Sequence, residues 1–193
     1  MMAAKVRRLL GLLFLAGTVA NPSLAAEEHR ELGAHEHGRG TLNIAVEGNK
    51  VTMELEVPGV DIVGFEHAAK TDREKAAVET AKTQLAAPLA LFALPAAAAC
   101  RVTEATVEVE IGEHDHDAKA GPTAAKEGGH SEFHVQYVLE CAAPGNITAI
   151  EFSYFRAFAG AQKLDVNVIT PKGGQSKFEV TRASPRLSLA GMM

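Results

Sequence analysis

The sequence predicts a mainly β fold of the α+β class, an antiparallel β-sandwich-like domain with one principal helix and a long loop containing histidine and aspartate. Two observations lead to this prediction. Several short segments alternate apolar and polar residues, and one segment combines a helix-capping signal with apolar residues at helical spacing. Many short strands accompanied by a single helix are typical of mainly antiparallel β domains.

The first 25 residues have the pattern of a secretory signal peptide. Residues 1–8 carry three basic residues and no acid, residues 9–20 are almost entirely apolar, and Ser23-Leu24-Ala25 offers small residues for cleavage after Ala25. About a dozen apolar residues are too few to span a bilayer comfortably, so we expect cleavage rather than an uncleaved anchor. Residues 26–193 are then expected to be a single exported domain without a membrane anchor.

The charge balance of the chain is acidic. Its formal net charge is −5, and removal of the three basic residues at the N-terminus would make it −8. Such a balance argues against nucleic acid or an anionic membrane as the partner, and it mildly favours cations.

Alternating apolar residues predict the strands. The first two alternating runs lie within residues 41–57 and flank Gly48-Asn49, a pair that is typical of a tight hairpin turn. Further strands are predicted at 103–111, 133–141, 149–155, 164–169 and 178–181. Residues 112–130 contain several glycines, a proline and many charges but no apolar periodicity, so they predict a mobile surface loop.

The principal helix is predicted between the hairpin and the later strands. Thr71 and Glu74 have the spacing of a capping box, in which both side chains satisfy backbone amides at a helix start. Apolar residues at helical spacing follow, so we expect a helix from about 72 to 87 that packs on the sheet. Pro88 should interrupt it, because proline lacks the amide that continues a helix.

The only two cysteines, Cys100 and Cys141, predict a disulfide bond. Thiols of exported proteins are normally oxidised in pairs, whereas the alternative, two thiolate metal ligands, needs a reducing compartment. Closing a loop of about 40 residues should add about 3 to 4 kcal/mol of stability. Strand alternation leaves open whether the bond joins neighbours in one sheet or links two sheets.

Histidine is the residue type that points to function, because all eight histidines follow the predicted cleavage site. Two His-x-His pairs, each bracketing a carboxylate, occur at 35–37 and 114–116. In an extended segment such residues point to one side, about 6.5 to 7 Å apart, so two imidazoles can converge on one ion. Zinc accepts imidazole and carboxylate ligands. The candidate metal ligands are His35, His37, His67, His114, His116, His130 and His134.

Two of these candidates have equally good alternatives. His67 suits a ligand or a residue that closes the connection between hairpin and helix. His134 falls on the face of its strand opposite Phe133 and Val135, which suits either a ligand at the base of the loop or an ordinary exposed residue.

Motifs of enzymes are missing from the sequence. It lacks His-Glu-x-x-His, Gly-x-Ser-x-Gly, a glycine-rich phosphate loop and Cys-x-x-Cys, so we expect that the protein is not an enzyme. A metal-dependent hydrolase therefore ranks below two non-catalytic functions. The first is a zinc-binding protein. The second is a structural or interaction domain whose loop histidines bind metal incidentally.

Several of these segments together resemble the ZrgA family, zinc-regulated periplasmic proteins of Gram-negative bacteria. The resemblance runs in order through nearly all of the chain after the signal segment. The segments that carry it are His35-Glu36-His37-Gly38, Ile62-Val63, Gly64-Phe65-Glu66-His67-Ala68, Ala99-Cys100, His130-Ser131-Glu132-Phe133, Tyr137 and Cys141.

This resemblance implies periplasmic zinc binding in support of zinc uptake, in company with a zinc-importing transport system. Zinc ions are the implied ligand. The sequence departs from the family in its loop, because family loops are often much richer in histidine, whereas here His114, His116 and His130 remain. The number of ions is therefore open.

Overall fold

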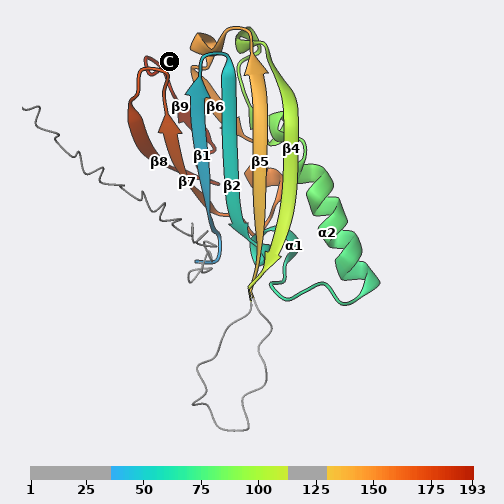
Figure 1. Ribbon diagram of the computed structural model, residues 1–193. Coiled ribbons are helices and arrows are strands. Elements are labelled where there is room, and N and C mark those ends of the chain that lie inside the picture. The colour runs from blue at the N-terminus through green and yellow to red at the C-terminus, as the bar shows by residue number, and fades with distance from the viewer. Residues whose placement is uncertain (1–35, 113–129) are drawn as a thin grey trace, which may run out of the picture. The chain divides into compact units, whose positions relative to one another are not determined.

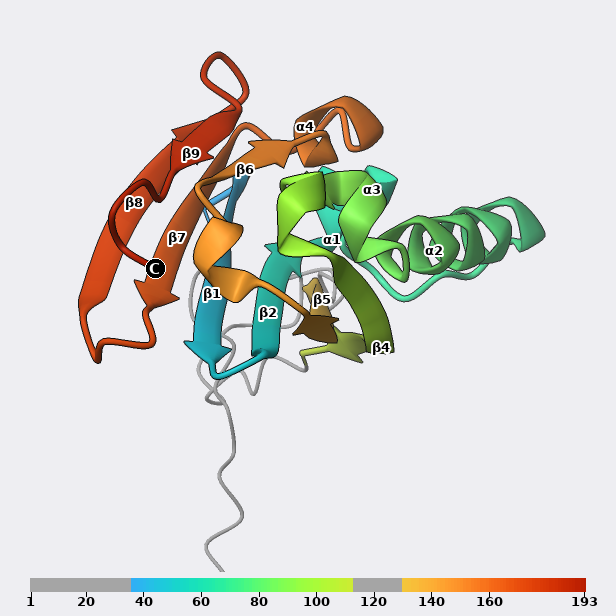
Figure 2. The ribbon, with the colours of Figure 1, turned by 90° about the horizontal axis from the view of Figure 1, so that it is seen from above.

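The computed structural model describes residues 36–112 and 130–193. The predicted signal segment, His35 and most of the predicted loop, residues 113–129, lie outside the described residues. The described chain is mainly β, as predicted, and its strands form two sheets (Figures 1 and 2). The larger sheet has six strands in the order β4-β5-β2-β1-β7-β8, and the smaller has three in the order β3-β6-β9.

The elements follow one another along the chain in a simple order. The strands are β1 (Arg39–Glu47), β2 (Lys50–Pro58), β3 (Phe92–Ala93), β4 (Cys100–Ile111), β5 (Ser131–Cys141), β6 (Ala149–Phe152), β7 (Lys163–Ile169), β8 (Gln175–Thr181) and β9 (Arg186–Ser188). The helices are α1 (Gly59–Val63), α2 (Asp72–Leu85), α3 (Pro88–Leu91) and α4 (Tyr154–Ala157), with short 3₁₀ turns at Ala96–Ala98 and Pro144–Asn146.

The larger sheet is built around the predicted hairpin. β1 and β2 pair antiparallel across Gly48-Asn49, so that Val46 faces Val51, and β5 and then β4 extend the sheet in antiparallel register. On the other side β1 pairs with β7 in parallel, which is the exception in an otherwise antiparallel pairing scheme. Two neighbouring parallel strands must be joined by a long crossover connection, and here residues 48–162 form it.

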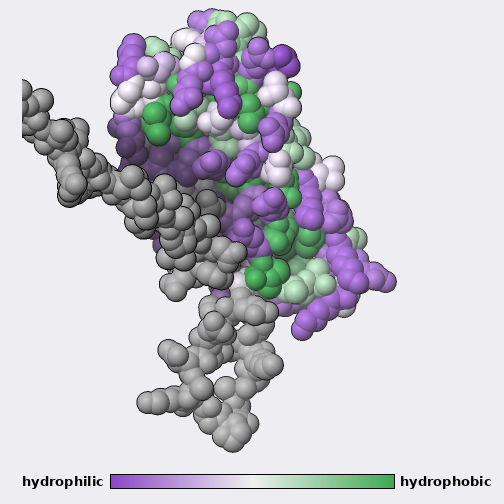
Figure 3. All heavy atoms as spheres, viewed as in Figure 1, coloured by the Kyte–Doolittle hydropathy of each residue, from purple (hydrophilic) through white to green (hydrophobic). Residues whose placement is uncertain are grey.

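The core lies between the two sheets. In Figure 2 the smaller sheet and the short helices α3 and α4 lie over one face of the larger sheet. The apolar residues of each alternating strand point into this layer, and Leu42, Leu55, Phe133 and Leu164 are fully buried. The opposite face is largely hydrophilic where Figure 3 shows it, so the period-two pattern of the sequence follows from having one buried and one solvated face.

Helix α2 begins as the sequence predicts. The Thr71 hydroxyl accepts the Glu74 amide N–H at 3.2 Å, and the Glu74 carboxylate accepts the Thr71 amide N–H at 2.9 Å. The helix ends at Leu85, two residues before the predicted end, and Pro88 starts the separate helix α3. The buried Tyr137 hydroxyl donates to the Leu85 carbonyl at 2.8 Å, which ties the end of α2 to β5.

The prediction of a strand over 149–155 is wrong in its second half. β6 ends at Phe152, and Tyr154 and Phe155 belong to the four-residue helix α4. Their apolar side chains are both buried, so the pattern correctly marked core residues. A short apolar run does not distinguish a strand from a buried helical turn, which is the reason for the error.

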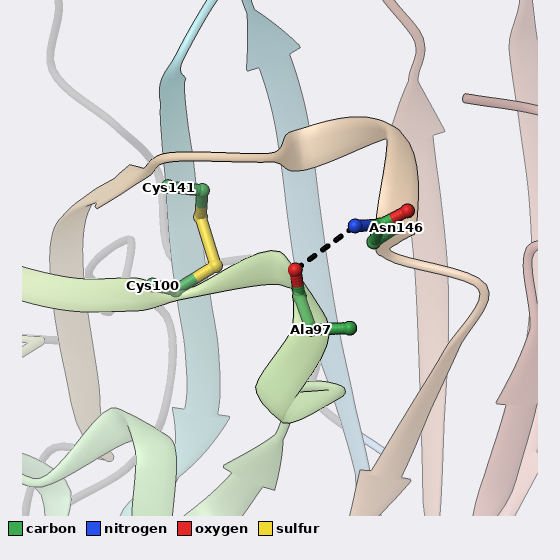
Figure 4. The surroundings of a disulfide bond; sticks show 4 residues. All are labelled: Ala97, Cys100, Cys141 and Asn146. Carbon is green, nitrogen blue, oxygen red and sulfur yellow. Dashed lines mark hydrogen bonds between the residues drawn. A yellow bond between two sulfur atoms is a disulfide. The ribbon is translucent and has the colours of Figure 1, made fainter.

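The predicted disulfide is present between Cys100 and Cys141 (Figure 4). The two cysteines are register partners on the neighbouring strands β4 and β5, with Cα atoms 3.9 Å apart, so the bond joins two strands of one sheet. Cys100 begins β4 and Cys141 ends β5. The bond therefore lies at the sheet end opposite Ile111 and Ser131.

Among the described residues, none of the helices has the length and apolar character needed to cross a bilayer.

Candidate metal centre

Three side chains from distant parts of the chain meet at the end of the larger sheet where β1 and β5 begin. His37 lies two residues before β1, Glu66 lies three residues after α1, and His130 immediately precedes β5. The Gly112 amide donates to the His130 carbonyl at 2.8 Å, which closes the ladder between β4 and β5 at this end. The sheet pairing thus brings His37 and His130 to the same end of the sheet.

Glu66 connects the two imidazoles. Its Oε1 lies 2.8 Å from Nε2 of His37, and its Oε2 forms a short contact with Nδ1 of His130. The Glu66 side chain is 18% exposed, whereas those of His37 and His130 are 62% and 45% exposed. A largely shielded carboxylate therefore stands between two solvent-accessible imidazoles.

Helix α1 places Glu66. Pro58 ends β2, and the five residues Gly59–Val63 form a short helix whose C-cap is Gly64. Gly64 has φ of +84°, a left-handed conformation that glycine adopts without the Cβ penalty. Phe65 and Glu66 follow this cap, and the Glu66 carboxylate lies against His37 at this end of the sheet.

Asp61 of the same helix is a buried carboxylate beside this group. Both of its oxygens accept the Gly38 amide N–H, at 2.8 and 2.9 Å. Burial raises the pKa of Asp61, while the Gly38 N–H and the nearby His37 act in the opposite direction. Asp61 thus makes a main-chain contact with the residue that follows His37.

The atoms of the cluster are of the kind that zinc accepts, and one pair of them is close to the spacing that zinc needs. Two ligand atoms about 2.1 Å from zinc at the tetrahedral angle lie about 3.4 Å apart. The 2.8 Å between His37 Nε2 and Glu66 Oε1 would therefore need only a small expansion, with loss of the proton between them.

The described residues do not by themselves form a complete metal centre. Within 36–112 and 130–193, no three His, Cys, Asp or Glu side chains are arranged to hold one ion. The two imidazoles contact opposite oxygens of Glu66 rather than converging on a single point. Zinc coordination would need a rearrangement of these side chains and a further donor.

His134 does not join this group. It lies on the outer face of β5, where its Nε2 is 3.0 Å from Glu132 and 3.5 Å from Glu110, and its Nδ1 is 3.9 Å from Glu56. The interaction with Glu132 raises the pKa of His134, Glu110 and Glu56 add to the effect, and burial opposes it. With a side chain only 13% exposed, it is a histidine held among carboxylates of three strands rather than an ordinary exposed residue.

His67 occupies the connection between α1 and α2. Its ring stacks on Phe65 with centroids 5.0 Å apart, its Nδ1 lies 3.0 Å from the Ala68 carbonyl, and its Nε2 lies 3.8 Å from Glu74. These contacts fit the alternative interpretation of a residue that closes this connection. The remaining candidates, His35, His114 and His116, lie outside the described residues.

Sequence reasoning missed the two carboxylates of the site, Glu66 and Asp61. Glu66 directly precedes a candidate histidine, and that adjacency was the available signal. Asp61 stands in the short apolar stretch after Pro58-Gly59, where an acidic residue without a charged neighbour could have indicated a buried partner.

Taken together, the described chain is a mainly β domain with a histidine and carboxylate cluster at one end of its larger sheet. The chain belongs to the ZrgA family of zinc uptake proteins, whose family model matches residues 34–189. The matched range contains both sheets and all of the predicted ligands, and it confirms the resemblance seen in the sequence. No curated protein matches the sequence.

Proposed function

We propose that this protein binds zinc in the periplasm and assists zinc acquisition. The observation that carries the proposal is the contact of both Glu66 oxygens with the ring nitrogens of His37 and His130. These groups come from three separate segments of the chain. Membership of a zinc uptake family supports zinc as the ion that they would bind. The predicted signal peptide and the disulfide support export to an oxidising compartment.

Additional donors are expected from the predicted His-x-His pairs. Chain geometry keeps the Cα atoms of residues two apart within about 7 Å of each other. His35 is two residues from His37, and His114 is two residues from Gly112, whose amide binds the His130 carbonyl. We expect His35 to supply a fourth donor beside His37, Glu66 and His130, which is the number of ligands that zinc usually takes, and the pair in the predicted loop to bind zinc separately.

Zinc titration of the mature protein against a competing chelator tests the proposal. His37→Ala, His130→Ala and Glu66→Gln should each weaken zinc binding at least about tenfold, because even partners that only orient ligands commonly contribute that much. Glu47→Gln is the matched control, since Glu47 is an exposed carboxylate at the opposite end of β1. If all three site variants bind zinc within about twofold of the wild type, zinc is bound elsewhere and the proposed site is wrong.

A second variant distinguishes zinc binding by His37, Glu66 and His130 from zinc binding by the predicted loop. Deletion of residues 113–129 leaves His37, Glu66 and His130 in the chain, so it should lower the number of bound ions or the rate of capture and keep the tightest binding event. Ordering each loop residue costs about 1 to 2 kcal/mol, which should make any site there weaker. Loss of the tightest event on deletion would place the principal ligands in the loop.

The alternative function is a structural or interaction domain with incidental metal binding. The observation that favours it is the lack of three converging ligands within the part of the chain that the structure describes. Stoichiometric binding with sub-micromolar affinity would exclude it, because unorganised surface histidines do not bind so tightly. Weak, non-stoichiometric binding that survives all three site variants would support it instead.

A further inference from the structure

We propose that Asp61, through the Gly38 turn that it holds, is the positioning residue of the zinc site. The inference rests on the proposed function and adds a residue that would not touch the ion. It concerns how His37, a side chain largely exposed to solvent, is kept against Glu66.

Packing of its own ring does not fix His37, because its side chain is 62% exposed. The main chain on its C-terminal side is fixed instead. The Gly38 amide N–H donates to both oxygens of Asp61, and the Gly38 carbonyl accepts the amide N–H groups of Gln162 and Lys163 at 2.9 and 2.8 Å. Gly38 is therefore held from both sides, by α1 on one and by the start of β7 on the other.

The turn at Gly38 depends on glycine. Its φ is +83°, and an added Cβ would lie 3.1 Å from Cγ of Gln162. A side chain at this position would be strained by its backbone conformation and tightly packed as well. The Gly38 turn therefore has one defined conformation, and this conformation sets the orientation of the preceding residue, His37.

Asp61 is itself rigidly placed. The residue is 5% exposed, and the backbone of Gly160 packs so closely that an added Cβ there would lie 2.6 Å from the Asp61 Cα and carbonyl oxygen. Three residues later Gly64 caps the helix and directs the chain to Glu66. One helical turn therefore sets both partners of the contact: Glu66 through the chain that follows it, and His37 through the Asp61 carboxylate.

Substitution of Asp61 tests this role. Asp61→Ala should weaken zinc binding about 10- to 100-fold, the usual effect of removing a group that orients a metal ligand. Asp61→Asn should lose less, because an amide oxygen can still accept the Gly38 N–H. Tyr137→Phe is the control for stability, since it removes one buried hydrogen bond, to the Leu85 carbonyl at the end of α2, and no contact of His37, Glu66 or His130, so its zinc affinity should equal that of the wild type.

A glycine pair tests the turn even if Asp61→Ala does not fold. Gly38→Ala should also weaken zinc binding at least about tenfold. Gly173→Ala imposes a comparable backbone strain, with φ of +75° and no atom within 4 Å of the added Cβ, but lies between β7 and β8. Its zinc affinity should not change. Folded Asp61→Ala or Gly38→Ala protein that binds zinc within about twofold of the wild type would overturn the inference, as would equal losses in the two controls.

A zinc-free measurement separates this inference from the proposed function. The imidazole NMR signals of His37, assigned by their loss in His37→Ala, should shift in zinc-free Asp61→Ala and remain in place in Tyr137→Phe. If His37→Ala leaves zinc affinity unchanged, the proposed site is wrong, whereas the imidazole signals still report on the positioning. If His37→Ala weakens binding while Asp61→Ala changes neither affinity nor signals, only the positioning role is wrong.

Discussion

The disulfide gives a prediction whose size follows from its place in the chain. Cys100 and Cys141 are separated by 41 residues, and the loop-closure estimate for a loop of that length is about 4 kcal/mol at 25 °C. The variant in which both cysteines become alanine should lose about 3 to 4 kcal/mol of unfolding free energy, chiefly because its unfolded chain is less constrained. For a domain of this size, that is a large part of the total stability.

Urea denaturation of the zinc-free protein is the appropriate assay, because bound zinc would add its own stabilisation. Wild-type protein reduced without substitution is the control and should unfold at nearly the same urea concentration as the double variant. The bond lies at the sheet end opposite His130, so zinc affinity of the folded variant should equal that of the wild type. A stability loss below about 1 kcal/mol would refute the entropic argument. A loss of zinc affinity in the folded variant would show that the two sheet ends are coupled.

Three further predictions concern pH and close packing. The interaction with Glu132 raises the pKa of His134 in the folded protein. The stability that protonated His134 contributes is therefore fully present below its unfolded-state pKa of about 6.5 and is lost as pH rises through its higher folded-state pKa. His134→Gln should therefore reduce unfolding free energy more at pH 6 than at about pH 9, and a difference independent of pH would contradict this. Gly160→Ala should cost about 1 to 3 kcal/mol, because its Cβ would lie 2.6 Å from backbone atoms of Asp61. Gly145→Ala, with no atom within 4 Å, is its control in the same denaturation assay, and equal stability of the two variants would disprove the packing argument. Zinc affinity should fall between about pH 7.5 and pH 5.5, because imidazole must release its proton to coordinate, and a flat profile in calorimetry would argue against histidine ligands.

The local elements of the fold could be predicted because their signals are local. The hairpin over 41–57 follows from two alternating runs around Gly48-Asn49, and the start of α2 follows from the spacing of Thr71 and Glu74. Both depend on interactions within a few residues of each other. The disulfide was predictable for another reason, because a chain with two cysteines in an oxidising compartment has only one intramolecular pairing.

The candidate site was predictable only in part. Histidine content identified His37 and His130 as candidates, but not that they share a partner. The contact between Glu66 and His130 joins residues 64 apart, and it exists because β2 and β5 are neighbours in the sheet. Periodicity shows which face of a strand is buried and carries no information on which strand lies beside it.

By itself, then, the sequence determined the longer strands, the principal helix and the disulfide partners, and it singled out histidine as the candidate metal ligand. The tertiary structure decided which histidines come together: His37 and His130 meet at Glu66, while His134 is held among carboxylates on the outer face of the sheet. It also decided that Asp61 is buried against the Gly38 amide. The physical reason is that local conformation depends on neighbouring residues, whereas the surroundings of a side chain depend on the order of strands, which is set by the burial of the whole apolar face.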